Sequence, residues 1–408
     1  MFALATLVFA ACSDDHAISD GNSDVVTDPS GDAWVALNIK TPAAVTRGLN
    51  IPNQENAITG EYEIEDVKAI FFDGDQDASL VTKVIDLSTG SGDLTSSGAS
   101  SSSKAFQIPA TSKTILIIAN PGAGFSSVGE GSSFVDVNKA VKDESITTSV
   151  AKTGTFLMTN SKGHLEPSDN SGNTINLTLY KSQDVAVKNP LAIYIDRVVA
   201  KVRVYTSDGA MDNSTASIYS PKWILNVTNK WYYPVSRRIK TWNEDPANTP
   251  DARGTCVTPF DRYEIGSYRV DPNYNNTNIG EWNEANQVAY TNNYNFVSAS
   301  TNASAISWNE ISSASNPVTE YCLDTQEKEY NNHAYTTQVL LQANFAPKKL
   351  KKLDGGTVDV GEGESWMIVN GVSYTYDTLM DWIENELTKK YKDGNPDGYP
   401  TSISTAFN

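Results

Sequence analysis

Short alternations of apolar and polar residues recur along most of the chain. In the stretch AWVALNIK, Val35, Leu37 and Ile39 occupy every second position, which is typical of a β-strand with one buried face. Clusters of Gly, Ser, Asn and Pro separate such runs, as expected for antiparallel β-sandwiches rather than alternating strands and helices. Similar runs lie at 67–72, 113–120, 154–160, 174–180, 191–205, 223–229 and 336–345. The pattern therefore predicts an all-β fold with minor α content.

Two segments have helical spacing instead. In SFVDVNKAVKDE, Phe134, Val137 and Val141 share one helical face, and Ser133 can cap its start. In YDTLMDWIENELTKKYK, we expect Asp377 to be the cap, and lysines occupy the last turn. The apolar stripe of this second helix consists of Leu379, Trp382, Ile383 and Leu387. Both helices are expected to pack on a sheet.

Polar stretches divide the chain. Residues 13–32 have almost no apolar periodicity and predict a flexible tether. The Ser-rich stretch at 96–104 predicts an exposed loop. A polar stretch at 206–220 follows the longest strand signal, and we place a domain boundary there. A length of 408 residues is compatible with two or three domains.

The first residues have the pattern of an export signal. Residues 1–11 are apolar, too short to cross a bilayer, and end in Ala10 and Ala11 directly before Cys12. This arrangement resembles a bacterial lipobox, in which the cysteine thiol receives a lipid; the alternative is a buried cysteine on a short strand. No Lys or Arg precedes the apolar run, so we expect residues 1–11 to be part of a longer signal peptide. The acidic residues after Cys12 resemble a surface-export signal.

The net charge limits the possible binding partners, and the cysteine content limits the possible disulfides. The chain has 49 acidic and 31 basic residues, a net charge of −18 and 39% hydrophobic residues. An acidic surface repels phosphate backbones, so nucleic acid is excluded as a partner, while the hydrophobic content suffices for real cores. Cys256 and Cys322 remain besides Cys12, and whether they pair stays open.

Motifs for catalysis, metal binding or cofactor binding are poorly supported. The loop PGAGFSSVG has Ser127 where a dinucleotide fingerprint needs its third glycine. The aspartates of DGDQDAS lack the Gly and Glu of a calcium loop, so a turn at a strand end is favoured over weak cation binding. The histidines have no ligand spacing and lie at His16, His164 and His333. We therefore predict no catalytic residue, no metal site and no cofactor.

Two weaker alternatives depend on abundant residue types. An acidic chain offers many carboxylate pairs, and a glycosidase needs only two. The chain also has eight Trp and 19 Tyr, and the stretch KWYYP at 230–234 could contribute to a sugar-stacking face. Aromatic side chains in a sandwich core or a subunit interface explain the same residues.

Arg47 lies in an accessible connection. It is flanked by Pro42 and Pro52 and followed by Gly48, a context in which proteolysis is easy. A cut there would separate the strand with Val35, Leu37 and Ile39 from the rest of the chain. The sheet would then be left with an open edge, which is a template for a strand of another chain. On these residues alone, an arginine in a solvated loop is the simpler interpretation.

A collinear set of weak motifs resembles the fimbrillin family of Bacteroidetes type V pili, in its minor fimbrial subunit branch. The set begins with the lipobox and Thr46-Arg47-Gly48, continues with EDVKAIFFDGD, GTFLMTNS and IDRVVAKVRV, and ends with WILNVTNKWYYPV and EYCLDTQEKEYNNHAYTTQVLLQANF. Together these motifs cover most of residues 7–350.

The resemblance implies a structural subunit without enzymatic activity. It implies two tandem transthyretin-like antiparallel β-sandwich domains, lipidation at Cys12, export to the outer membrane surface, and cleavage after Arg47 by a trypsin-like protease. Loss of the first strand would open a groove that a strand of another fimbrial subunit fills, so that the fimbria forms and supports adhesion. The expected divisions are 1–11, signal peptide; 12–47, lipidated propeptide with tether and removable first strand; 48–206, N-terminal domain; and 207–408, C-terminal domain.

The chain departs from the family pattern at its end. Family members continue beyond the helix at 377–391 with further strands, whereas this sequence ends in GYPTSISTAFN without an alternating apolar run. We expect the sequence to be truncated there. The alternatives to a shaft subunit are a fimbrial anchor, a tip adhesin and a glycan-binding surface lipoprotein.

Overall fold

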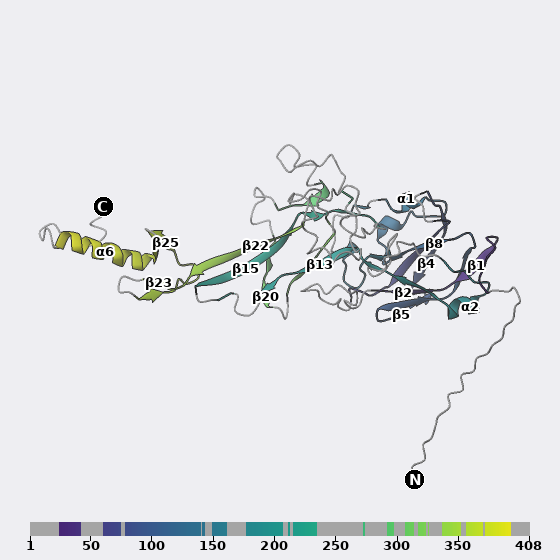
Figure 1. The fold of residues 1–408 in the computed structure, drawn as a ribbon, viewed down its shortest axis with the longest axis horizontal. Coiled ribbons are helices and arrows are strands. Elements are labelled where there is room, and N and C mark those ends of the chain that lie inside the picture. The colour runs from purple at the N-terminus through teal and green to yellow at the C-terminus, as the bar shows by residue number, and fades with distance from the viewer. Residues whose placement is uncertain are drawn as a thin grey trace, which may run out of the picture.

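The protein is mostly β-strand, with few helices in the part of the chain that the structure describes (Figure 1). The structure is a computed structural model. The all-β prediction with minor α content is therefore confirmed. The described ranges are 24–41, 60–74, 78–139, 141–142, 149–160, 177–206, 211–212, 215–234, 272–273, 292–297, 307–313, 317–323, 325, 337–351, 356–369 and 372–392.

Two sheets form a sandwich in the N-terminal half. The first sheet is antiparallel throughout and has the order β12-β10-β8-β3-β4. Its strands are β3 (Asp66–Phe72), β4 (Val81–Ser88), β8 (Thr114–Ala119), β10 (Met158–Thr159) and β12 (Asp196–Arg197). The second sheet has the order β11-β2-β6-β5. Its strands are β2 (Leu37–Lys40), β5 (Leu94–Ser97), β6 (Ser100–Ser103) and β11 (Leu191–Tyr194). A further pair joins β1 (Asp32–Val35) to β7 (Phe106–Pro109).

Alternate residues of both sheets build the core of this sandwich. In β3, Val67, Ala69 and Phe71 are almost fully buried, and Leu37 and Ile39 of β2 belong to the same cluster. Successive side chains of a strand point to opposite faces, so each strand contributes every second residue. The strands expected at 67–72 and 113–120 are confirmed, whereas the single strand expected at 33–40 is two strands, β1 and β2, which belong to different sheets.

The outer face of the first sheet is buried as well. Ile70 and Phe72 of β3 pack in a second cluster with Phe125 and Val137. These two residues belong to the 3-10 helix η1 (Ala123–Phe125) and the helix α1 (Phe134–Val137). Because both of its faces are covered, β8 is buried at every position, and its sequence TILIIA is apolar without alternation.

The second half combines one long strand pair, β15 with β22, with several pairs of short strands. Trp223 of β15 is fully buried and packs with Leu225 and Cys322. The pairs are β13 (Val199–Arg203) with β21 (Thr319–Leu323); β14 (Tyr205–Thr206) with β20 (Ser312–Ser313); β19 (Asn309–Glu310) with β15 (Ala216–Asn226) and β15 with β22 (Gln338–Pro347); β16 (Thr228–Asn229) with β18 (Tyr294–Asn295); β17 (Trp231–Tyr232) with β9 (Val141–Lys142); β23 (Leu350–Lys351) with β24 (Thr357–Val358); and β25 (Trp366–Val369) with β26 (Val372–Thr375). Strand pairs such as β13 with β21 join residues on either side of the expected boundary at 206, and the division into domains stays a prediction.

Several expected elements differ in extent. The run at 191–205 is not one strand but β11, β12, β13 and β14, each paired with a different strand. Of 154–160, only Met158–Thr159 is a strand, because the chain turns at Gly154, whose φ is +88°. Around 174–180, the described residues contain only isolated bridges at Tyr180.

The first expected helix is much shorter than its apolar spacing suggests. Ser133 does cap it, since its Oγ accepts from the backbone N–H of Asp136 while the Asp136 carboxylate accepts from Ser133. The helix nevertheless ends at Val137, and Val141 lies on β9 instead of on the same helical face. Pairing of β9 with β17 replaces the helical turns expected there.

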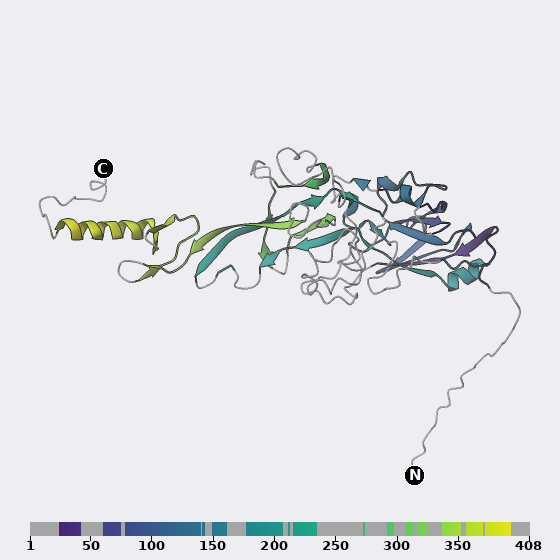
Figure 2. The ribbon, with the colours of Figure 1, turned by 45° about the horizontal axis from the view of Figure 1, so that its top comes forward.

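The second helix, α6 (Tyr376–Lys392), covers the expected residues. Its cap is not Asp377, because Thr375 Oγ1 accepts from the Thr378 N–H at 3.3 Å and Asp377 lies inside the first turn. The helix does not pack broadly on a sheet: Trp382 contacts Tyr374 of β26 with ring centroids 6.1 Å apart, and the apolar stripe stays half-buried. In both views α6 lies at the end of an elongated molecule opposite the N-terminal sandwich (Figures 1 and 2).

Asn160 extends the edge between β10 and β8 with its side chain. Its Oδ1 accepts from the Ile117 N–H at 2.7 Å, and its Nδ2 donates to the Ile115 carbonyl at 3.1 Å. Both contacts are buried. The side-chain amide therefore satisfies backbone groups of β8 that would otherwise lose their partners.

We expect Asn160→Ala to lower the free energy of unfolding by about 2–4 kcal/mol, since it leaves one buried N–H and one buried carbonyl unpaired. Urea unfolding followed by tryptophan fluorescence measures this change. The matched control is Asn385→Ala, whose exposed amide bonds only within α6. Equal stability of the two variants would contradict this role for Asn160.

Candidate functional site

The segment Asp32–Lys40 forms part of the core of the N-terminal sandwich. Val35 is 1% exposed, and Leu37 and Ile39 are 0% exposed. All three belong to the cluster between the two sheets. The three side chains predicted from alternation to point inward therefore do so, and removal of the segment from the sheet stays a prediction.

Strand β2 is an inner strand, with a neighbour along each edge. It pairs antiparallel with β6 and parallel with β11, where Leu37 lies opposite Leu191 and Ile39 opposite Ile193. The parallel pair departs from the purely antiparallel sandwich expected from the sequence. A parallel partner needs a long connection, and β11 follows β2 by about 150 residues.

Backbone bonds close both edges of this segment. The Leu191 N–H donates to the Ala36 carbonyl at 2.8 Å, and the Ile195 N–H donates to the Lys40 carbonyl at 3.0 Å. On the other edge, the Thr41 N–H donates to the Ala99 carbonyl at 2.9 Å. The segment is therefore held by main-chain bonds as well as by its apolar side chains.

The Ser-rich stretch at 96–104 is not an exposed loop, contrary to our expectation. It forms the hairpin of β5 and β6, in which Ser97 pairs with Ser100 across the two-residue turn Gly98-Ala99. Gly98 has a φ of +58°, which a glycine adopts without strain. The serine hydroxyls bond within the sheet: Ser96 Oγ and Ser101 Oγ are 2.8 Å apart, and Ser101 is buried. The sequence analysis therefore missed β6, which is one neighbour of β2, although Gly98 could have indicated the hairpin turn.

The polar side chains of β2 also have partners. Lys40 Nζ donates to the Tyr194 hydroxyl at 3.2 Å and lies 5.0 Å from the centroid of the Tyr194 ring. Ser100 Oγ donates to Asn38 Oδ1 at 2.7 Å. These contacts link β2 to β11 and to β6 through side chains, in addition to the backbone ladder.

Other residues predicted to matter lie outside the described residues. These are Cys12, Arg47, Gly48, Cys256 and the three histidines. Asp73 lies in the turn after β3, where its carboxylate accepts from the Leu80 N–H at 2.8 Å, while Asp75 and Asp77 are not described. Within the described ranges, no group of three His, Cys, Asp or Glu side chains is arranged to hold a metal, and no helix is long and apolar enough to cross a bilayer.

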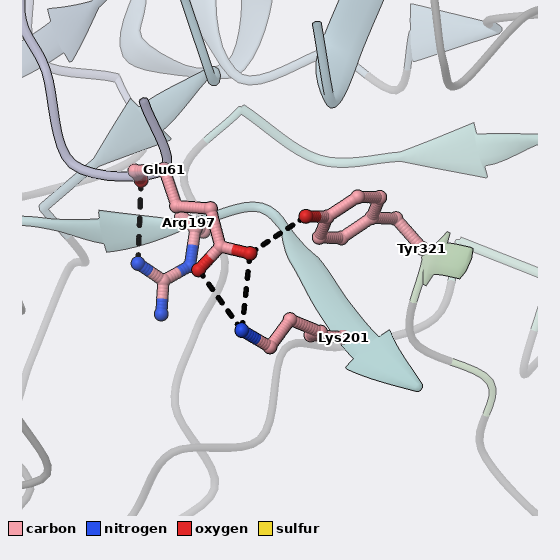
Figure 3. Close-up of polar contacts among 4 residues, drawn as sticks. All are labelled: Glu61, Arg197, Lys201 and Tyr321. Carbon is pink, nitrogen blue, oxygen red and sulfur yellow. Dashed lines mark hydrogen bonds and ion pairs between the residues drawn. The ribbon is translucent and has the colours of Figure 1, made fainter. Parts of the chain in front are cut away.

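A buried acidic residue, Glu61, fixes the chain on the C-terminal side of the expected cut (Figure 3). Lys201 Nζ lies 3.1 Å from Glu61 Oε1 and 3.2 Å from Oε2, and the Tyr321 hydroxyl donates to Oε1 at 2.6 Å. Arg197 donates to the Glu61 carbonyl at 3.3 Å. This cluster could not be predicted from the sequence, because Glu61 is one of several acidic residues in a short stretch.

This cluster joins distant parts of the chain. Lys201 lies on β13 and Tyr321 on β21, and the adjacent Gly60 carbonyl accepts from the Gly154 N–H at 2.8 Å. Breaking a buried ion pair by removing one partner is costly, so the chain is held firmly from residue 60 onward. A cut after Arg47 would therefore leave this attachment intact.

Burial, followed by the hydrogen bond to the Glu61 carboxylate and its charge, raises the pKa of the Tyr321 hydroxyl well above its usual range. The hydroxyl thus stays protonated and donates to Glu61. The Tyr321 ring also packs edge-on against Phe156, with centroids 4.9 Å apart.

We expect Tyr321→Phe to lower the free energy of unfolding by about 1.5–3 kcal/mol at neutral pH, which is the contribution of a hydrogen bond to a charged group. A raised folded-state pKa stabilises the fold below the unfolded-state value of 10.0, and this stability is lost as the pH rises above it. The difference in free energy of unfolding between the parent and the variant should therefore become smaller above about pH 10. Urea unfolding between pH 8 and 11 measures this change.

The matched control is Tyr376→Phe, on a side chain that is exposed at the start of α6. It should change the free energy of unfolding by less than ~0.5 kcal/mol at any of these pH values. A deficit of Tyr321→Phe that does not change with pH would contradict the role of the protonated hydroxyl.

Several solved structures are similar to this chain in outline. A proposed cell adhesion protein of Parabacteroides distasonis is 11% identical, with 80% of this chain and 85% of that chain covered and a TM-score of 0.36. The tip fimbrial protein Mfa3 of Porphyromonas gingivalis, with a C-terminal truncation, is 11% identical, with 85% and 98% covered and a TM-score of 0.35. A proposed cell adhesion protein of Bacteroides eggerthii is 12% identical, with 85% and 96% covered and a TM-score of 0.30.

No protein-family model matches the chain, and no curated protein matches it either. At these identities and TM-scores, the structural likenesses carry no weight for family or function. Membership of the fimbrillin family therefore stays a prediction from the sequence motifs.

Proposed function

We propose that the protein is a structural subunit of a cell-surface fimbria that supports adhesion. It is exported as a lipoprotein anchored in the outer membrane through Cys12, is cut after Arg47 by a trypsin-like protease, and polymerises with other fimbrial subunits by strand exchange. The observation that carries the proposal is the inner position of β2, with Leu37 and Ile39 fully buried between β6 and β11.

The position of β2 supports a blocked acceptor groove. While the segment Asp32–Lys40 stays covalently attached, β1 occupies the edge of β7, and β2 occupies the edges of β6 and β11. After a cut at Arg47 the segment can leave, and those three edges and the pockets of Leu37 and Ile39 become available together. Polymerisation through this groove then waits until export is complete, because in the uncut chain β2 itself occupies the groove.

The geometry also specifies the incoming strand. A replacement must run parallel to β11 and antiparallel to β6, as β2 does. It must place apolar side chains at alternate positions to fill the pockets of Val35, Leu37 and Ile39. Backbone hydrogen bonds would supply the binding affinity, and the alternating apolar side chains would set the register.

The described aromatic residues do not favour a glycan-binding face. Within the described ranges every Trp is buried or half-buried, and the exposed tyrosines are Tyr205 on β14 and Tyr376 on α6. The stretch 230–234 contributes a buried Tyr232 to the second core cluster. A fimbrial anchor or tip position remains an alternative for this subunit, to be separated by whether fibres contain the cut or the lipidated form.

Limited trypsin treatment of the purified chain tests the activation step. We expect a first cut after Arg47, followed by ladders on gels and fibres in electron micrographs. Arg47→Ala should stay uncut at this position and monomeric under the same treatment. If Arg47→Ala polymerises as readily as the parent, activation by this cut is wrong.

A second test concerns release of the cut segment. Ile39→Ala removes buried apolar contacts worth about 2–5 kcal/mol, so the fragment ending at Arg47 should dissociate at least tenfold faster after cleavage. Size-exclusion chromatography followed by mass spectrometry measures the fragment that stays bound. Asp32→Ala, at an exposed position of the same segment, is the control and should release at the parental rate.

A further inference from the structure

The segment Asp32–Lys40 passes from one sheet to another at a single residue. β1 ends at Val35 and pairs with β7, whereas β2 begins at Leu37 and lies between β6 and β11. Ala36, the residue between them, belongs to neither strand. A strand that replaces the segment, as the proposed function requires, therefore has to make the same crossing between sheets.

The chain opposite this crossing contains one extra residue. Val35 lies opposite Phe106, and Asn38 lies opposite Ser102. Two residues of the segment therefore face the three residues 103–105, which is the arrangement of a β-bulge. Because a bulge interrupts the backbone ladder, the polar backbone groups at the crossing need other partners.

The hydroxyl of Ser103 is one of these partners. Its Oγ accepts from the Leu37 N–H at 2.9 Å, and from the other edge the Leu191 N–H donates to the Ala36 carbonyl at 2.8 Å. Both polar groups of the peptide bond between Ala36 and Leu37 are thus bonded. These contacts use only backbone atoms of the segment, so any strand that has an N–H at the position of Leu37 can make them, which excludes proline there.

The space at Ala36 is closed. Its side chain is 2% exposed, although it does not belong to the apolar cluster that contains Val35 and Leu37. Three successive residues are therefore buried at the crossing, whereas a strand with one buried face buries every second residue. A larger side chain at Ala36 would have to displace its neighbours, which is unfavourable in a closely packed interior.

We propose that the crossing is a specificity site of the groove that β2 occupies. It accepts an extended peptide segment with alanine or glycine at the position of Ala36 and a residue other than proline at the position of Leu37. The Ser103 hydroxyl positions this segment by accepting its N–H. The inference rests on the proposed function, since it concerns which strand can enter the same groove.

A small residue at the crossing fixes the register of the entering strand. Alternation has a period of two, so a strand that slips by two residues still directs apolar side chains inward. In the present segment such a slip would bring Trp34 or Asn38 to the position of Ala36. Both side chains are larger than alanine, so the closed space disfavours the slipped registers.

Competition between a synthetic peptide and the chain's own segment tests the site. The probe is a fluorescently labelled peptide of residues 24–41, DVVTDPSGDAWVALNIKT. The full chain carries a recognition sequence for a site-specific protease inserted after Arg47, so that the cut does not depend on trypsin. The cut chain is unfolded in urea and refolded with the peptide in excess. The label that elutes with the chain in size-exclusion chromatography measures binding.

We expect the parental peptide to bind, and the peptide with Ala36→Leu to bind at least roughly tenfold more weakly, because the added side chain overfills a closed space. The matched control is the peptide with Asp32→Leu. It adds the same side chain at an exposed position and should bind like the parental peptide. Equal binding of the Ala36→Leu peptide and the parental peptide would overturn the inference.

Removal of the N–H tests the role of Ser103. A peptide with an ester in place of the amide between Ala36 and Leu37 lacks the N–H that Ser103 accepts. We expect the ester to bind the parental chain roughly three- to tenfold more weakly than the amide does, and this ratio to fall at least about twofold in Ser103→Ala. Ser97→Ala, at an exposed serine of the same hairpin, should keep the parental ratio. An unchanged ratio in Ser103→Ala would contradict positioning by this hydroxyl.

The uncut chain provides an independent measurement. Ala36→Leu should lower the urea midpoint of the uncut chain, whereas Asp32→Leu should leave it unchanged, whether or not the chain is ever cut at Arg47. Equal midpoints of these two variants would mean that the space at Ala36 is not restricted, and the inference would be wrong.

Failure of this inference can be distinguished from failure of the proposed function. Equal binding of all the peptides would mean that strands exchange without selection at the crossing, which overturns the inference alone. No binding of the parental peptide would overturn the inference and strand exchange together.

Discussion

The inner position of β2 is the constraint on which the N-terminal sandwich depends. Its backbone bonds to neighbours on both edges, and Leu37 and Ile39 fill the space between the sheets. An edge strand can leave a sheet and expose one row of backbone groups. Loss of an inner strand separates β6 from β11 and exposes two rows together with an apolar floor. The same position makes β2 structurally necessary in the intact sheet, and under the proposed function its removal would leave a place that another strand can fill.

Two free energies decide whether the segment Asp32–Lys40 would stay bound after the proposed cut. Burial of the Val35, Leu37 and Ile39 side chains contributes on the order of 5–9 kcal/mol in total. Association of a separate segment costs about 4–15 kcal/mol in lost translational and rotational freedom. The two ranges overlap, and the backbone bonds of the segment add to the first, so the proposed cut would remove the tether without necessarily expelling the segment. Because the chain from Gly60 onward is held through Glu61, displacement of the segment by a competing strand, as proposed, would leave this attachment in place.

Local periodicity was sufficient to predict the strands that carry the site, because alternation is a property of consecutive residues. Val35, Leu37 and Ile39 were assigned to the buried face from spacing alone, and they lie there. Their partners are not local, and neither the Ser-rich β6 nor the parallel β11 has a sequence signal for pairing with β2. Glu61 was missed for the same reason, since its burial depends on Lys201 and Tyr321, more than a hundred residues away.

The two halves of the chain differ in how far their strand edges are paired within the chain. In the N-terminal half, the edges on either side of β2 are satisfied within the chain, and the neighbouring hairpin is rich in serine hydroxyls that bond within the sheet. In the second half, the described part of the chain leaves Val339, Leu341 and Phe345 of the uncharged strand β22 exposed. A folded chain with a net charge of −18 can keep these side chains in solution, because the rest of its surface repels other copies.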